Sequence, residues 1–341
     1  MSKRFASSSL SVLLLASGCL AQTGAGLMMQ GPSGGVVLDQ RLAALRPVNG
    51  LDGASLLGAP IAAGFPLRSA AISGNAAVFL NEDQPARIYW ISDLAAGGPV
   101  RWIDSELPAI SRVFLSASGD DALVYSSELG LLQRIDGLRA KAGLSAPIHL
   151  TVPGKVSAIA ANGTADRLLI AADGEDGTGT LWLVSLANNA AAARHLGALT
   201  LPASLQFAQA GDEAAAVSLR SGELFRIASL QLNPEMSRLA GPEDGLENPL
   251  AVCAAANGRW AVVNQSGTSL VMADHTGLAR IDLLWKADRC EWVSGQRFAL
   301  NAAGQDPLQI LDLTAGVAAA VTVTPVDRTG ESVSTGEAVS K

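Results

Sequence analysis

The sequence predicts an all-β protein folded as a β-propeller, and three observations support this prediction. An apolar strand that ends at a turn glycine, followed by two further apolar strands, recurs along the chain at Gly74, Gly119, Gly163, Gly211, Gly258 and Gly295. The intervals between these glycines are 45, 44, 48, 47 and 37 residues, which is the range expected for propeller blades. Hydrophobic residues make up 49% of the chain and charged residues 16%, which favours a large buried core.

The N-terminus has the pattern of an export signal. Lys3 and Arg4 precede the apolar stretch Leu10–Ala16, which is too short to span a membrane as a helix. The following residues, Ser17-Gly18-Cys19, resemble a bacterial lipobox, although Ala16 stands where Leu is usual. We therefore expect residues 1–21 to be a signal peptide with lipidation at Cys19. Cleavage after Ala21 without lipidation is the alternative.

The remaining chain divides into three segments by composition. Residues 22–35 lack hydrophobic periodicity and are expected to be a flexible tether. Residues 36–324 contain the strand pattern and are expected to form the propeller. Residues 325–341 are polar and rich in Gly, Ser and Thr, which predicts a disordered tail.

Each repeat is expected to be a four-stranded antiparallel blade. The innermost strands read RSAAI, SRVFL, KVSAI, ASLQF, LAVCA and RCEWV, and each leads into a turn where glycine permits a positive φ. Six complete units favour six blades, with residues 36–50 closing the ring against the sixth. The alternative is seven blades, with residues 36–60 pairing with residues 314–324.

Two cysteines remain after the signal, Cys253 and Cys290. Each lies five residues before the glycine of its repeat, so the pattern places them at equivalent positions of neighbouring innermost strands. Equivalent side chains point the same way around the ring, and stacked sheets lie about 10 Å apart. We therefore expect two buried thiols; a disulfide requires a one-residue slip in register.

The repeat residues resemble those of a known group. The segment ASGDDALVYSSELGLLQRIDGL resembles WD40-like and YVTN-type repeats of exported bacterial β-propellers. The segment LRPVNGLDGASLLGAPI is similar to one that precedes such repeats in exported acidobacterial proteins. This resemblance implies a fold and an exported location, and it implies no activity.

No catalytic motif stands out in the chain. His149, His195 and His275 lack the spacing of metal ligands, and no G-x-S-x-G motif is present. The most distinctive loop carries Asp173, Glu175 and Asp176, which offer oxygen ligands for Ca²⁺; a Gly-rich hairpin is the simpler interpretation. No other cofactor is expected.

Surface binding is the remaining route to function. Trp102 and Trp285 fall on expected outermost strands and are candidates for contact with a partner or ligand. The net charge of −7, without a basic run, argues against nucleic acid as a partner and against membrane attachment other than through a lipid anchor.

We therefore expect a monomeric, non-enzymatic propeller that binds a protein or cell-envelope component. Its expected location is the outer membrane or periplasm as a lipoprotein, or the medium as a secreted protein. The alternative function is a metal-dependent lactonase or glycan-processing enzyme with its site at the channel mouth.

Overall fold

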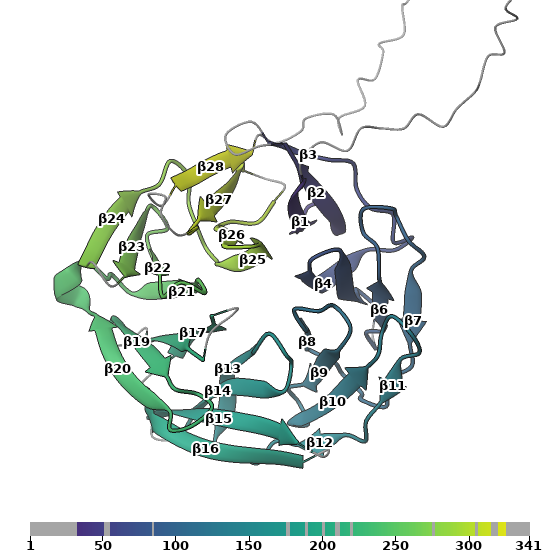
Figure 1. Cartoon of the computed structure of the whole chain (residues 1–341), viewed down its shortest axis with the longest axis horizontal. Helices are drawn as coiled ribbons and strands as arrows, with labels where there is room; N and C mark the ends of the chain where they lie inside the picture. Colours follow the sequence, from purple (N-terminus) through teal and green to yellow (C-terminus); the bar gives the residue numbers. More distant parts are fainter. Residues whose placement is uncertain are drawn as a thin grey trace, which may run out of the picture. The chain divides into compact units, whose positions relative to one another are not determined.

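Seven small sheets surround a central axis (Figure 1). The computed structural model describes residues 33–50, 55–83, 85–174, 178–187, 190–199, 202–208, 212–218, 221–274, 277–303, 306–314 and 320–324. These residues belong to one compact unit. Within this unit the sheets follow one another in chain order, and we number them as blades 1 to 7. No helix of the described residues is long and apolar enough to cross a membrane.

The first four blades have these strands. Blade 1 contains β1 (Ser33–Asp39), β2 (Ala44–Asn49) and β3 (Leu56–Leu57). Blade 2 contains β4 (Leu67–Ser73), β5 (Ala76–Asn81), β6 (Ile88–Ile91) and β7 (Arg101–Ile103). Blade 3 contains β8 (Arg112–Leu115), β9 (Ala122–Ser126), β10 (Leu131–Asp136), β11 (Gly143–Leu144) and β12 (Ile148–His149). Blade 4 contains β13 (Lys155–Ala161), β14 (Arg167–Asp173), β15 (Gly179–Ala187) and β16 (Ala190–Ala198).

The last three blades each have four strands. Blade 5 contains β17 (Pro202–Phe207), β18 (Ala214–Ser218), β19 (Glu223–Ala228) and β20 (Glu235–Ala240), and the 3₁₀ helix Pro242–Asp244 follows it. Blade 6 contains β21 (Pro249–Ala254), β22 (Trp260–Asn264), β23 (Ser269–Asp274) and β24 (Gly277–Asp282). Blade 7 contains β25 (Glu291–Ser294), β26 (Arg297–Ala299), β27 (Leu308–Asp312) and β28 (Ala320–Thr324).

The predicted β-propeller of antiparallel, mostly four-stranded blades is confirmed. The number of blades is the alternative of seven and not the favoured six. The N-terminal strands make a seventh sheet of their own, and β28 pairs with β27 rather than with residues 36–60. Blade 7 therefore has four strands without help from the N-terminus. β1 begins at Ser33, inside the segment predicted as tether.

The repeat pattern did not reveal blade 1, because the turn between its first two strands contains no glycine. The turn between β1 and β2 is instead stabilised by the Asp39 carboxylate, which accepts hydrogen bonds from the backbone N–H groups of Arg41 and Leu42 at 3.0 Å each. Ala43 adopts a positive φ of 47° at the end of this turn. In blades 2 and 3, Gly74 (φ 55°) and Gly119 (φ 70°) fill the left-handed position as predicted.

The hydrophobic core lies between neighbouring blades. The second strands β5, β9, β18 and β22 are buried along their whole length, because each is covered by an adjacent sheet on both faces. Blade 1 takes part on both sides: Val36 and Leu45 pack with blade 2, whereas Val37 and Val48 pack with blade 7. This packing closes the ring.

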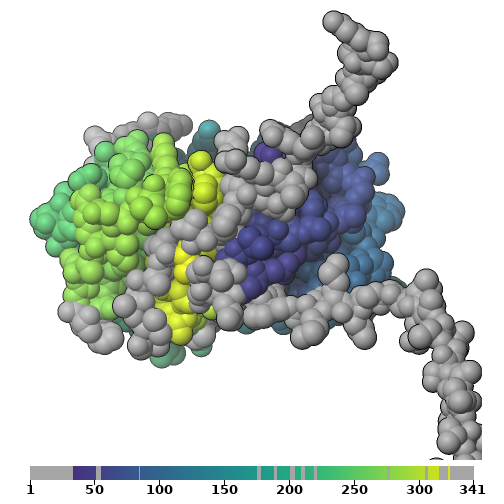
Figure 2. Space-filling model, turned by 90° about the horizontal axis from the view of Figure 1, so that it is seen from above, coloured from purple at the N-terminus to yellow at the C-terminus, as the bar shows by residue number. Residues whose placement is uncertain are grey.

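Blades 7 and 1 meet side by side, as Figures 1 and 2 both show. The hydroxyl of Ser294 donates a hydrogen bond to the carbonyl oxygen of Gly34 at 2.7 Å, and Asp39 forms an isolated bridge with Ala303. The contact between the first and last blades is therefore made by packing and hydrogen bonds.

Cys253 and Cys290 form a disulfide between blades 6 and 7, with their Cα atoms 5.5 Å apart, so the expectation of two free thiols was wrong. The error came from the turns. In blade 6 residues 255–259 separate the paired Ala254 and Trp260, whereas in blade 7 only residues 295–296 separate the paired Ser294 and Arg297. Counting back from the two glycines therefore does not reach equivalent positions.

The packing of the two cysteines agrees with this explanation. Cys253 is buried on the side of blade 6 that faces blade 7, in a cluster with Phe298 and Leu300. Cys290 belongs to the same cluster and so faces blade 6. The two side chains therefore point toward one another. A structural disulfide is typical of proteins from oxidising compartments, so this bond is consistent with export.

Candidate functional site

The centre of the ring contains a cavity of about 560 Å³. Its wall is made mainly by the innermost strands β1, β4, β8, β13, β17 and β25, so six of the seven blades contribute to it. This volume falls within the range of small-molecule sites, which are about 300–1,000 Å³. The cavity is therefore large enough for one small ligand or for a side chain of a partner.

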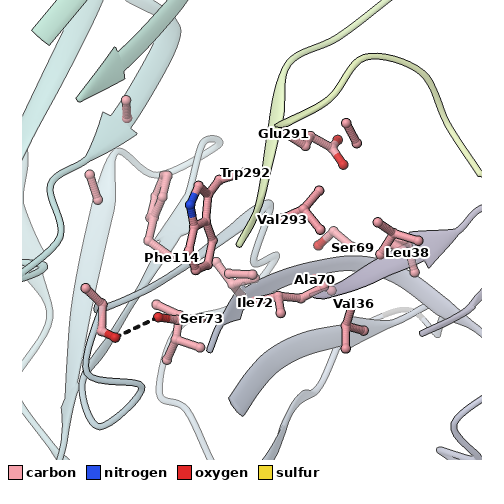
Figure 3. A pocket seen from close by; sticks show the side chains of 18 of the residues that line it. Val36, Leu38, Ser69, Ala70, Ile72, Ser73, Phe114, Glu291, Trp292 and Val293 are labelled. Carbon is pink, nitrogen blue, oxygen red and sulfur yellow. Dashed lines mark hydrogen bonds between the residues drawn. The ribbon is translucent and has the colours of Figure 1, made fainter. Parts of the chain in front are cut away.

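Most of the wall is apolar (Figure 3). The largest apolar side chains come from five blades and are Leu38, Ile72, Phe114, Leu115, Phe207 and Trp292. The indole N–H of Trp292 donates to the carbonyl oxygen of Gly295 at 2.9 Å, which fixes the ring where it lines the cavity. Such a wall binds through dispersion and the release of water rather than through directed bonds.

Three polar side chains in this wall are engaged within the propeller, whereas the Oγ of Ser69 is buried without a hydrogen-bond partner among the described residues. The hydroxyl of Ser73 donates to the carbonyl oxygen of Ala117 at 2.9 Å. The side-chain oxygen of Gln206 accepts from the backbone N–H of Ala254 at 2.9 Å. The side chain of Asn162 is bonded within its own turn. These groups join neighbouring blades or hold a turn, and they offer little to a ligand.

Two charged residues line the cavity, both near the starts of their strands. The guanidinium of Arg68 on β4 donates to the carbonyl oxygen of Ile110 in the next blade. Glu291 on β25 pairs with Arg289, with 3.3 Å between Oε1 and Nη1. Burial lowers the pKa of Arg289, but hydrogen bonding and charge from Asp288 together with Glu291 raise it above its ordinary value.

The metal-dependent alternative requires several oxygen ligands that converge at the channel mouth. Of the described residues that line the cavity, Glu291 is the only carboxylate. In the described part of the chain no three His, Cys, Asp or Glu side chains lie close enough to hold a metal ion. The geometry of the described residues therefore adds no support to this alternative.

The predicted Ca²⁺ loop is described only in part. Asp173 is the last residue of β14, and its Oδ1 is buried without a hydrogen-bond partner among the described residues. Glu175 and Asp176 lie outside the described residues, as do Cys19 and the segments predicted as signal peptide (residues 1–21) and tail (residues 325–341). Calcium binding and lipidation therefore stay predictions.

The two tryptophans proposed for partner contact lie on different blades. Trp102 sits on β7, the outermost strand of blade 2, and is 62% exposed. Trp285 is half-buried and follows β24 rather than lying on it, and its carbonyl oxygen accepts a hydrogen bond from Gln309 at 2.9 Å. The structure does not bring them into one site, and their role in binding stays a prediction.

Sequence reasoning missed the residues that distinguish the cavity. Neither Trp292 nor Phe114 was among the candidate residues, although a signal was available. In the innermost strands SRVFL and RCEWV, a large aromatic residue stands at the fourth position, where the other four strands have Ala, Ala, Gln and Cys. An aromatic residue on the strand nearest the axis can face the channel, where there is space for it.

Comparisons with known proteins agree on the fold. No protein-family model matches this chain. No curated protein matches it either. Among solved structures, a functionally unknown protein from Desulfotomaculum acetoxidans is 13% identical, with a TM-score of 0.56, and the match covers 86% of this chain and 99% of that one.

Two further structures are similar. Hydrazine synthase from Kuenenia stuttgartiensis is 11% identical, with a TM-score of 0.54 over 91% of this chain and 100% of that one. The β-propeller domain of Cps50 (Swd1) from Myceliophteria thermophila is 13% identical, with a TM-score of 0.52 over 87% and 97%. The predicted resemblance to WD40-like and YVTN-type propellers is therefore confirmed for the fold, and at these identities for the fold alone.

Proposed function

We propose that this protein is an exported, non-enzymatic propeller that binds an apolar group of a protein or cell-envelope component in its central cavity. The observation that carries the proposal is the apolar wall around about 560 Å³ at the ring axis, with Trp292 and Phe114 among its lining residues. Apolar cavities of this size, on a rigid frame, are the usual form of a ligand site.

Export is supported by two independent features. The disulfide between Cys253 and Cys290 is of a kind that persists in oxidising compartments. The N-terminal pattern that ends at Cys19 is of the type that directs export and lipidation. Replacing Cys19 by Ala should move the protein from the membrane fraction to the soluble fraction of the envelope. Unchanged membrane fractionation would refute the lipid anchor.

The cavity is tested by filling it. Ala70 lines the cavity from β4, so Ala70→Trp should occupy the space that a ligand needs. The matched control is Ala279→Trp, on the exposed outermost strand β24. With the neutral fluorescent probe N-phenyl-1-naphthylamine, the wild type and the control should bind and Ala70→Trp should lose binding at least about tenfold.

A second measurement connects the cavity to a natural partner. Crosslinking and pull-down from the native envelope should recover the same component with the wild type and with Ala279→Trp, and should lose it with Ala70→Trp. Equal recovery by all three proteins would place binding elsewhere and overturn the proposal. Circular dichroism and the melting temperature verify that each variant folds. If Ala70→Trp does not fold, Ala70→Leu provides a smaller substitution at the same position.

A further inference from the structure

The rim of blade 4 carries a long strand whose outer edge is open. β16 has nine residues, whereas the other outermost strands of the described residues have six or fewer. Figure 1 shows β16 along the outside of the ring. Within the described part of the chain it is the last strand of its sheet, so its outer edge pairs with no strand. The four residues from Ala192 to His195 are all exposed, so both faces of the strand lie open there.

Alternate residues of β16 direct their backbone N–H and C=O groups outward. In an antiparallel pair, opposite residues alternate between those that exchange both backbone hydrogen bonds and those whose backbone groups point away from each other. The pair Ala187–Ala190 is of the first kind, because only two residues connect it. Ala191 and Ala193 are therefore oriented so that their N–H and C=O groups face away from β15. They offer two donors and two acceptors to a further strand.

This edge lacks the features that usually discourage strand pairing. Open edges are commonly protected by charged residues, by proline or by very short strands. The outermost strands β20 and β24 each carry one acidic and one basic residue, whereas the segment Ala190–Ala193 carries no charge and no proline. Alanine has a low strand propensity, so strand preference does not explain the run. Its small side chain leaves the backbone accessible to a second strand.

Two side chains beside the edge indicate which partner fits. The guanidinium of Arg194 donates to the carbonyl oxygen of Leu232 at 3.5 Å and to Oδ1 of Asn233 at 2.7 Å, and both acceptors are uncharged. These bonds place Leu232 next to β16, and its side chain is 86% exposed. Glu235 begins the neighbouring strand β20, so the attraction of Arg194 for a carboxylate is modest. An extended segment with an apolar and an acidic side chain is complementary to this surface.

A second copy of this chain is less complementary. Pairing of two β16 strands would place two Arg194 side chains close to one another, and like charges on paired strands repel. It would also bring together two molecules that each have a net charge of −7. The charges therefore favour a different protein as the occupant.

We propose that the outer edge of β16 binds an extended segment of a partner protein, which joins blade 4 as a fifth strand. Backbone bonds to Ala191 and Ala193 hold the segment, while an apolar side chain packs on Leu232 and a carboxylate lies at Arg194. In strand addition, main-chain bonds supply affinity and the flanking side chains supply specificity. The surface lies on the rim and not in the central cavity, so the inference goes beyond the proposed function.

The probe is a fluorescently labelled peptide, STLTETLTS, with blocked termini, and binding is measured by fluorescence anisotropy. Its Thr residues favour a strand, and its Leu and Glu residues lie on one face. The wild type should bind this peptide. A form with N-methyl groups on the central Glu and the preceding Thr cannot pair along either edge and should bind at least about tenfold more weakly. A form with Lys in place of Glu should bind about threefold more weakly.

A variant tests the same bonds from the side of the protein. Ala193→Pro removes a donor that faces solvent, a position at which edge strands tolerate proline, so the variant should fold. It should bind the peptide at least about tenfold more weakly, whereas the matched control Ala193→Ser, which keeps the N–H, should change binding less than about twofold. Bound peptide should also slow hydrogen exchange at the amides of Ala191 and Ala193.

Four outcomes would overturn the inference. They are no binding of the peptide to the wild type, equal binding of the plain and N-methylated peptides, equal binding to the wild type and Ala193→Pro, and a dimer of the wild type in sedimentation that Ala193→Pro dissociates. If Ala193→Pro does not fold, the comparison of the two peptides on the wild type decides. Ala70→Trp should leave peptide binding unchanged, and Ala193→Pro should leave binding of N-phenyl-1-naphthylamine unchanged, so failure here is distinguishable from failure of the cavity.

Discussion

Blade 1 and blade 4 solve the same packing problem with different chemistry. Blade 4 has four strands of seven to nine residues, and its second strand is almost wholly buried. Blade 1 has three strands, of which β3 spans only two residues. It compensates with a buried ion pair: Asp39 is 0% exposed, Arg46 is 4% exposed, and 3.2 Å separates Oδ2 from Nη1.

The guanidinium of Arg46 also replaces part of a missing sheet. It donates to the carbonyl oxygen of Leu57 at 3.0 Å and to that of Gly58 at 2.7 Å, so one side chain connects all three strands of blade 1. The comparison teaches that a short blade at the end of the chain depends on a few specific polar bonds, whereas a long internal blade depends on apolar area. Of the five predictions below, those on Arg46, Leu169 and Asp166 concern blades 1 and 4 directly, and the other two concern contacts between other blades.

Removal of the Arg46 side chain should have the largest effect. Arg46→Ala leaves Asp39 buried without its charge partner and should cost about 4–5 kcal/mol of unfolding free energy. The matched control in blade 4 is Arg167→Ala. In the wild type, Nη1 of the half-buried Arg167 lies 3.8 Å from Oδ1 of Asp212, and loss of this pair should lower the free energy of unfolding by about 1 kcal/mol or less. Chemical denaturation measures both. Similar costs for the two variants would contradict the distinction between the blades.

Loss of the disulfide should come next. A bridge that closes a 37-residue separation stabilises the fold by about 4 kcal/mol in the chain-entropy view, so Cys253→Ser with Cys290→Ser should lower the melting temperature strongly. Reduction of the wild type should lower it to the same value. If the reduced and oxidised wild-type proteins melted together, the bond would have no role in stability.

Truncation of a buried apolar side chain in blade 4 should lower the free energy of unfolding by about 3 kcal/mol. Leu169 is fully buried on β14, so Leu169→Ala removes packing and leaves a cavity. Leu45→Ala is the equivalent change in blade 1. We expect Arg46→Ala to exceed Leu45→Ala in blade 1, and Leu169→Ala to exceed Arg167→Ala in blade 4. The reverse order in either blade would overturn the comparison.

Substitution of a turn glycine should cost about 2 kcal/mol. Gly119 has a φ of 70°, and an added Cβ would lie 2.9 Å from the Cβ of Ala76 in the neighbouring blade. Gly119→Val should therefore lower the melting temperature, while Gly130→Val, with a similar φ but open space around its Cβ, should lower it less. Equal effects of the two substitutions would show that the contact between the blades has no influence.

The smallest effect concerns pH. Burial alone would raise the pKa of Asp166, but hydrogen bonds from Thr164 and Asn162 and the charge of Arg167 hold it below its ordinary value. The folded state thus favours the ionised form. This contribution is present above the unfolded pKa of about 3.9 and is lost as pH falls through the lower folded value.

Asp166→Asn should therefore lower stability by less than about 1 kcal/mol at pH 7, because the group is partly exposed. The difference in melting temperature between the variant and the wild type should shrink as pH falls below about 4. A difference that stayed constant from pH 7 to pH 3 would exclude a role for the ionised carboxylate.

The sequence was sufficient for the repeated blades because their information is local. Alternating strands, turn glycines and a regular interval each depend on neighbouring residues, and these signals marked blades 2 to 7. In blade 4 the positive φ expected at Gly163 is found instead at Ala165 (φ 55°), and Gly211 of blade 5 lies outside the described residues. Blade 1 lacks the turn glycine. Its first turn is stabilised instead by the Asp39 carboxylate, which accepts hydrogen bonds from the backbone N–H groups of Arg41 and Leu42. A carboxylate and an arginine inside the apolar run VVLDQRLAALRPV were the available signal.

The candidate cavity and the disulfide could not be predicted because they depend on how blades are placed against one another. The directions in which the side chains of Cys253 and Cys290 point depend on the lengths of the two turns that follow them. In the same way, whether Trp292 packs into a sheet or faces the axis depends on the bulge between Trp292 and Ser294 in β25. A single-residue shift on one strand thus decides a property of the whole ring.

The place where the chain begins and ends in the ring has a mechanical consequence. Six of the seven contacts between blades are crossed by the polypeptide, and the one between blades 6 and 7 carries a disulfide as well. The contact between blades 7 and 1 has no covalent crossing among the described residues. We expect this contact to separate first when the ring is strained by heat or force, which would open the central cavity sideways through the wall that β1 and β25 form.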